Sequence, residues 1–105
     1  MLRIKNGVTL HGLVPQMMLA VFAIKHIYDA KGKDLVITSG NDGKHSVGSK
    51  HYAGSALDFR TNNLNDPSLE GPLIVNELNI ALGRDYDILF EGDHIHIEYD
   101  PKRPL

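Results

Sequence analysis

A short stretch near the end of the chain, residues 94 to 99 with the sequence HIHIEY, constrains the possible fold more than any other. Polar and apolar residues alternate along it, and successive side chains of a β-strand point to opposite faces of a sheet. One face of this strand therefore carries His94, His96 and Glu98, and the other face is apolar. The apolar face must be buried, so we expect helices to cover it.

The rest of the chain contains the other elements that such a sheet needs. Residues 86 to 90, followed by the tight Glu91-Gly92-Asp93 connection, predict a hairpin with the last strand. Further strands are expected at residues 35 to 38 and 55 to 61. Helical spacing of apolar residues predicts one helix over residues 15 to 28 and a second that ends at Gly83. The second helix begins at either Asp66-Pro67 or Gly71-Pro72.

These elements predict an α+β fold, with one antiparallel sheet and helices packed on one of its faces. The first helix is apolar nearly all round, which indicates that it lies beneath other elements. The opposite, polar face of the sheet is expected to carry Asp58, Arg60, His94, His96 and Glu98.

Size and charge limit what the chain can be. Its 105 residues suffice for a single domain over residues 1 to 105. A net charge of −2 without a basic run excludes the positive field that nucleic-acid binding requires. Lys25 and His26 interrupt the most apolar stretch before it could span a membrane. The N-terminus lacks the pattern of a secretory signal, so we expect synthesis in the cytoplasm. We also expect the protein to be a monomer.

The histidine content points to metal chemistry. The chain has six histidines and no cysteine, so any bound metal ion must be held by His and carboxylate side chains. Two spacings are candidates: His51 followed by Asp58, and the pair His94 and His96. Each arises easily by chance when taken alone, so the surrounding residues must decide.

The residues around the first spacing, 49 to 58 with the sequence SKHYAGSALD, match a longer pattern. The segment resembles the S-x-H-x-x-G-x-A-x-D signature of peptidase family M15. This group, also called LAS, comprises zinc peptidases of the bacterial cell wall: D-Ala-D-Ala carboxypeptidases, VanY-like enzymes and phage endolysins. Its second motif is a late H-x-H or E/D-x-x-H, and residues 91 to 98 fit it. The resemblance covers about Val36 to Asp100 and implies a hedgehog or D-Ala-D-Ala peptidase-like fold.

The resemblance implies a role for each of these residues. His51, Asp58 and His96 would be the Zn²⁺ ligands, with a fourth position left for water. We expect Glu91 to be the catalytic base, and Asp93 is the second candidate. His94 would be the group that stabilises the transition state, or would itself replace the base.

The substrate-binding residues are less well defined, because the chain departs from the family pattern. Many relatives carry a Ser-Gly-Tyr-Arg run whose Arg binds a substrate carboxylate, whereas Ser39-Gly40 is followed here by Asn41. Lys44, Lys50 or Arg60 could replace that Arg, and Arg60 could instead pair with Glu98 across the polar face. Ser49 is expected to support a ligand or to contact substrate.

The resemblance thus implies a zinc-dependent peptidase that hydrolyses stem peptides of peptidoglycan. The bond cut would be L-Ala-D-Glu, as in endolysins, or a D-Ala bond, as in carboxypeptidases. A lysin of this kind would reach the cell wall after release from the lysing cell. The alternatives are a non-catalytic zinc-binding module of the same fold, which acts by binding a partner, and a metal-free interaction domain.

Overall fold

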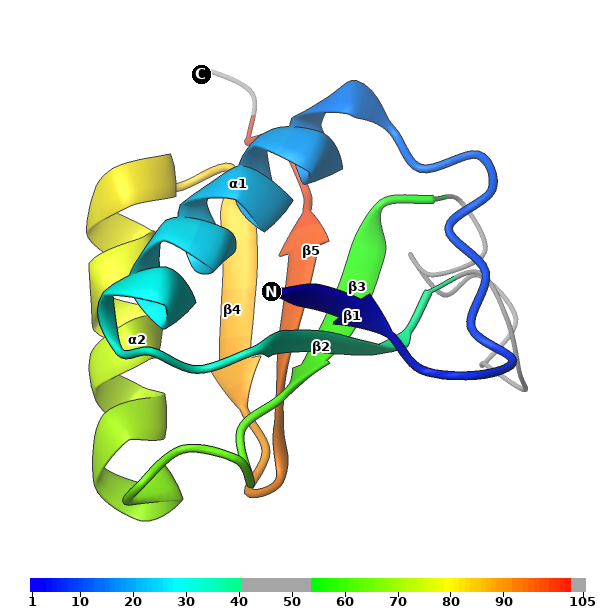
Figure 1. Cartoon of the computed structure of the whole chain (residues 1–105). Coiled ribbons are helices and arrows are strands. Elements are labelled where there is room, and N and C mark those ends of the chain that lie inside the picture. The colour runs from blue at the N-terminus through cyan, green and yellow to red at the C-terminus, as the bar shows by residue number, and fades with distance from the viewer. Residues whose placement is uncertain (41–53, 103–105) are drawn as a thin grey trace.

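The structure is a computed structural model that describes residues 1–40 and 54–102. Figure 1 shows the helices on one side of a single sheet. In chain order the elements are β1 (Leu2–Ile4), α1 (Pro15–Ala30), β2 (Leu35–Ser39), β3 (Ala56–Arg60), α2 (Pro67–Leu82), β4 (Tyr86–Phe90) and β5 (His94–Tyr99). The α+β class and the predicted hairpin of β4 and β5 are confirmed, and the second helix begins at the earlier of its two candidate positions.

The sheet is mixed and not purely antiparallel, which corrects one expectation. Its strand order is β1-β2-β3-β5-β4. All neighbouring strands pair antiparallel except β1, which pairs parallel with β2. The sequence did not reveal β1 because three residues are too few for the alternation of Leu2, Arg3 and Ile4 to stand out from chance, and all three are exposed. Helix α1 connects β1 to β2, and a helical crossover of this kind places two strands parallel.

The core lies between the two helices and one face of the sheet. On β3 and β5 the apolar side chains of Leu57, Phe59, Ile95 and Ile97 are almost completely buried, as the alternation predicted. The Tyr28 ring packs edge-on against Phe59 with 5.8 Å between ring centroids. Its hydroxyl donates a hydrogen bond of 2.7 Å to the carbonyl of Arg60. These contacts hold α1 against β3, the strand that carries Asp58 on its other face.

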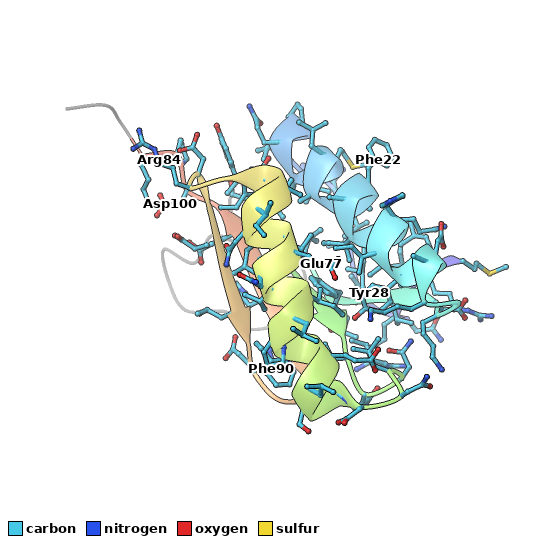
Figure 2. The ribbon with its side chains drawn as sticks, turned by 90° about the vertical axis from the view of Figure 1, so that its left-hand side faces the viewer. Phe22, Tyr28, Glu77, Arg84, Phe90 and Asp100 are labelled. Carbon is cyan, nitrogen blue, oxygen red and sulfur yellow. The ribbon has the colours of Figure 1, made fainter. Side chains whose placement is uncertain are left out.

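Helix α1 is not covered on all sides, which corrects a second expectation. Met17, Ile24 and Tyr28 face the core, whereas Leu19 and Phe22 are 60% and 64% exposed. Figure 2 shows Phe22 projecting outward from α1, away from α2. Only two helices lie against the sheet within the part of the chain that the structure describes, so no further layer covers this side. No helix among the described residues is long and apolar enough to cross a membrane.

Candidate metal and catalytic site

Asp58 and His96 lie opposite each other on the polar face of the sheet. The register of β3 against β5 pairs these two residues directly. The His96 Nδ1 atom is 2.8 Å from the Asp58 Oδ1 atom. Both side chains are mostly buried, with exposed fractions of 16% and 18%. Two of the three residues predicted as zinc ligands therefore meet, although they are far apart in the sequence.

Glu98 forms a hydrogen bond with the second ring nitrogen of His96. The His96 Nε2 atom is 2.9 Å from the Glu98 Oε1 atom. These hydrogen bonds to Asp58 and Glu98 outweigh the effect of burial and raise the pKa of His96 from 6.5 to about 9. A histidine that binds a metal through one nitrogen usually donates its other N–H to a carboxylate. The Asp58-His96-Glu98 arrangement has this form.

The donors fit a zinc ion chemically. Two ligand atoms at about 2.0–2.2 Å from one tetrahedral zinc ion lie roughly 3.3–3.6 Å apart, so a small side-chain rotation would admit the metal between Asp58 and His96. The remaining predicted ligand, His51, lies outside the described residues. Ser49, Lys44 and Lys50 also lie outside them, so their predicted roles stay predictions.

A second group of acidic residues, Asp87, Glu98 and Asp100, shares Glu98 with this arrangement and brings three carboxylates close enough to share an ion. Lys102 already occupies part of it, because its Nζ atom is 3.2 Å from Asp87 and 3.4 Å from Asp100. Exposed acidic groups of this kind are common without a metal. The cluster therefore gives no information about zinc.

His94, two residues before His96 on β5, lies close to both candidate bases. The His94 Nδ1 atom is 2.7 Å from Asp93 Oδ1, and its Nε2 atom is 3.7 Å from Glu91 Oε1. The hydrogen bond from His94 holds the pKa of Asp93 below its usual range, so Asp93 is ionised at neutral pH. The tight hairpin connection between β4 and β5 brings these three side chains together.

A pocket of about 380 Å³ opens on this polar face. Asp58 and Arg60 of β3 line it together with Asp93 and His94 of the hairpin. Glu91 is not among its lining residues. The other residues that line it are Lys5, Thr38, Ser39 and Asn62. The pocket thus joins one side of the candidate metal site to Asp93 and His94.

The structure decides one of the two alternatives for Arg60, and its role in substrate binding stays a prediction. The register places Arg60 opposite His94, whereas Glu98 lies opposite Ala56, four residues away along β3. The predicted pairing of Arg60 with Glu98 is therefore wrong, because a pair across a sheet needs residues in register. Arg60 lines the pocket instead, in keeping with its other predicted role.

Comparison with known proteins identifies no relative. No protein-family model matches the chain, and neither a curated protein nor a solved structure matches it.

Gly54, one of the motif positions, has a clear structural role. Its φ of +72° is one that only glycine adopts readily, and a Cβ atom here would overlap the carbonyl oxygen of Gly12. The Gly54 carbonyl accepts a 3.0 Å hydrogen bond from the Val14 N–H. Gly54 thus anchors the start of β3 against the segment that leads into α1.

Sequence reasoning missed two residues of this face. The orienting role of Glu98 was readable in principle, because the alternation in β5 already placed Glu98 beside His96. Lys5 gave no signal in the sequence, because it reaches the pocket only through the parallel pairing of β1 with β2.

Proposed function

We propose that this protein is a zinc-dependent peptidase that hydrolyses an amide bond in the stem peptides of peptidoglycan. One observation carries the proposal: Asp58 and His96 meet on the polar sheet face, with Glu98 on the second His96 nitrogen. The motif over residues 49 to 58 supports the same conclusion from the sequence alone.

Asp58 and His96 would hold the metal, with His51 as the third ligand. Zinc, when bound in such a site, lowers the pKa of its water and polarises a substrate carbonyl. Glu98 keeps the His96 ring oriented by accepting a hydrogen bond from its Nε2–H group. The partial burial of Asp58 and His96 limits competition from bulk water for their donor atoms.

Asp93 is the base that the geometry favours. It lines the same pocket as Asp58, and its Oδ1 atom is 2.7 Å from the His94 Nδ1 atom. An ionised carboxylate can take the proton of the attacking water and later deliver it to the leaving amine. Glu91, placed first on sequence grounds, contacts His94 at 3.7 Å and would act through that ring. His94 would donate to the oxyanion that develops on the scissile carbonyl.

The substrate class follows from the motif resemblance together with the polar lining of the pocket. Asp58 and His94 line it next to hydroxyl and amide side chains, which suit the hydrogen-bonding groups of a peptide backbone. The enzyme would act at the cell wall, which it would reach after release from the lysing cell.

The test is metal-dependent hydrolysis by the purified protein. Zinc content is measured by elemental analysis, and cell-wall sacculi and synthetic stem peptides are incubated with and without chelator. We expect about one zinc ion per chain and release of peptide fragments that chelator abolishes. Asp58→Asn and His96→Gln should lose both properties, whereas Asp87→Asn, in the acidic cluster beside β5, should keep them.

Two outcomes would contradict the proposal. In the first, the protein binds zinc but hydrolyses nothing, and Asp93→Asn and Glu91→Gln bind a partner as the parent does. This result would identify a non-catalytic zinc module. In the second, the protein binds no zinc and chelator does not change its thermal stability. This result would identify a metal-free interaction domain.

A further inference from the structure

We propose that Thr61 is a positioning residue that holds the turn between β4 and β5, and with it Asp93 and His94, against the end of β3. This inference rests on the proposed function, in which Asp93 is the base and His94 donates to the oxyanion. Thr61 follows β3 directly and belongs to neither of the two sequence motifs, so it receives a role here that no pattern in the sequence suggested.

The side chain of Asp93 is not fixed by packing. It is 76% exposed, and its contact with His94 is a contact with the next residue along the chain. A side chain of this kind takes its position from the backbone that carries it. The place of the turn relative to β3 therefore decides how Asp93 faces the pocket that Asp58 lines.

Two hydrogen bonds join Thr61 to successive carbonyls of the turn. The Thr61 N–H donates a 2.9 Å hydrogen bond to the Asp93 carbonyl, which continues the pairing of Arg60 with His94 beyond the end of β3. The Thr61 hydroxyl donates a 3.1 Å hydrogen bond to the Gly92 carbonyl. The first bond could be made by any residue except proline, whereas the second requires a hydroxyl at this position.

Thr61 can hold the turn because the core holds Thr61. Its side chain is 0% exposed, and its carbonyl accepts a 3.0 Å hydrogen bond from the N–H of Leu64, which is itself 5% exposed. The Arg60 carbonyl, one residue earlier, accepts the hydrogen bond from the Tyr28 hydroxyl of α1. The turn is thus attached through Thr61 to the packed side of the molecule.

The bonds within the turn serve a different purpose. The Glu91 N–H donates a 2.8 Å hydrogen bond to the His94 carbonyl, and the Asp93 N–H donates one of 3.2 Å to the Glu91 carbonyl. These bonds fix the shape of the turn, and the attachment to Thr61 fixes where that shape lies. Loss of the hydroxyl should therefore let the turn shift, and a shift of about 1 Å in a reacting group can cost about 10²-fold in rate.

The experiment separates the hydroxyl of Thr61 from its volume. Thr61→Val keeps the size of the side chain and removes the hydroxyl, whereas Thr61→Ser keeps the hydroxyl and removes the methyl group. Steady-state hydrolysis of a stem peptide uses the zinc-loaded full-length protein. Thr61→Val should lower kcat about tenfold, change KM less than twofold and leave zinc content unchanged. Thr61→Ser should keep the kcat of the parent.

Thermal unfolding of the same variants tests whether kcat merely follows stability. Thr61→Ser leaves a small cavity, so its unfolding midpoint should fall although its kcat does not. Ile27→Val, which removes a methyl group from the core side of α1, is the control and should show the same combination. The positioning role is overturned if Thr61→Val keeps the kcat of the parent, or if Thr61→Ser loses as much kcat as Thr61→Val.

Amide hydrogen exchange tests the attachment without turnover, so failure of the proposed function can be told apart from failure of this inference. The Glu91 N–H reports on the turn, and the Ile24 N–H in the middle of α1 reports on unfolding of the whole domain. In Thr61→Val the Glu91 N–H should exchange about tenfold faster relative to the Ile24 N–H, and in Thr61→Ser it should not. This result supports the positioning of the turn even when the protein hydrolyses nothing. Equal relative exchange in the parent and Thr61→Val would overturn it, whatever the protein hydrolyses.

Discussion

His96 makes two short contacts with carboxylates, one through each ring nitrogen. The contact with Asp58 exists because β3 and β5 pair in a register that sets these residues opposite each other. The contact with Glu98 exists because residues two apart on a strand share a face. Side chains from two strands, Asp58 of β3 and Glu98 of β5, therefore hold the ring in one orientation. A metal ligand or a proton-binding group requires such a fixed orientation.

Asp93 is expected to contribute more to catalysis than Glu91. Asp93→Asn keeps the size of the side chain and its place beside His94 but removes the base, so kcat should fall about 10²–10⁴-fold. Glu91→Gln should reduce kcat far less, because Glu91 does not line the pocket. Steady-state hydrolysis of a stem peptide measures both variants, with zinc content as the control. A larger loss for Glu91→Gln would restore Glu91 as the base.

Gly54 is expected to be much less replaceable than Gly92. Both have positive φ values, of +72° and +88°, so an alanine at either position costs about 1–2 kcal/mol of backbone strain. At Gly54 the new Cβ would in addition overlap the Gly12 carbonyl oxygen, whereas nothing lies near it at Gly92. Chemical denaturation should show that Gly54→Ala lowers the free energy of unfolding by about 2 kcal/mol more than Gly92→Ala. Equal losses would mean that the close approach to Gly12 is not formed.

Helix α1 has one face in the core and one face in solvent. Pro15 starts it at a position where the missing N–H costs nothing, and Ile24 and Tyr28 hold it against the sheet. Its outer face remains apolar, with Leu19 and Phe22 exposed. Composition alone therefore overestimated the burial of this helix, because the sheet and α2 cover only part of its circumference.

Paired substitutions in α1 measure this asymmetry. Ile24→Ala removes a side chain that is 1% exposed and should lower the free energy of unfolding by about 2–5 kcal/mol. Phe22→Ala removes a larger side chain that is 64% exposed and should change it by less than about 1 kcal/mol. Denaturant titration of both variants provides the measurement. A comparable loss for Phe22→Ala would show that the outer face of α1 is covered in solution.

The apolar core lies on one face of the sheet and the candidate site on the other. Both helices and nearly all large buried side chains lie on one face. The other face carries Asp58, Arg60, His94, His96 and Glu98, all of intermediate burial. Substitutions on the polar face are therefore expected to change charge and hydrogen bonding there, with little effect on the packing of the core.

The charge on His96 makes the stability of the metal-free protein depend on pH. The pKa of His96 is raised to about 9 in the folded protein, compared with 6.5 for an unperturbed histidine. The folded state therefore retains this proton longer than the unfolded state. The resulting stabilisation is complete below about pH 6.5 and is lost as the pH rises through about 9.

Denaturant titrations of chelator-treated protein between pH 6 and pH 10 measure this effect. The free energy of unfolding should fall across this range in the parent. It should fall less in His96→Gln, which lacks the titrating group, so the difference between the two proteins isolates the contribution of His96. Parallel curves for parent and variant would contradict hydrogen bonds from a protonated His96 to Asp58 and Glu98.

Local patterns were sufficient to predict most elements and the face on which the candidate site lies. The alternation in β5 assigned Ile95 and Ile97 to the core and His94 and His96 to the opposite face, because strand geometry leaves no other choice. Strand β1 and the position of Lys5 escaped prediction, since a pattern of three residues is too short to distinguish a strand from chance. The absence of a cross-strand pair between Arg60 and Glu98 also became evident only from the register of β3 with β5.

The chain's pattern thus specified which residues share a face, and tertiary structure decided which of them touch. Periodicity is a local property: it fixes the direction of each side chain relative to its own backbone. The 2.8 Å contact between Asp58 and His96 depends on strand order and register, which arise only when the whole core packs. The position of Lys5 beside the pocket depends on the same packing, through the parallel pairing that α1 imposes between β1 and β2.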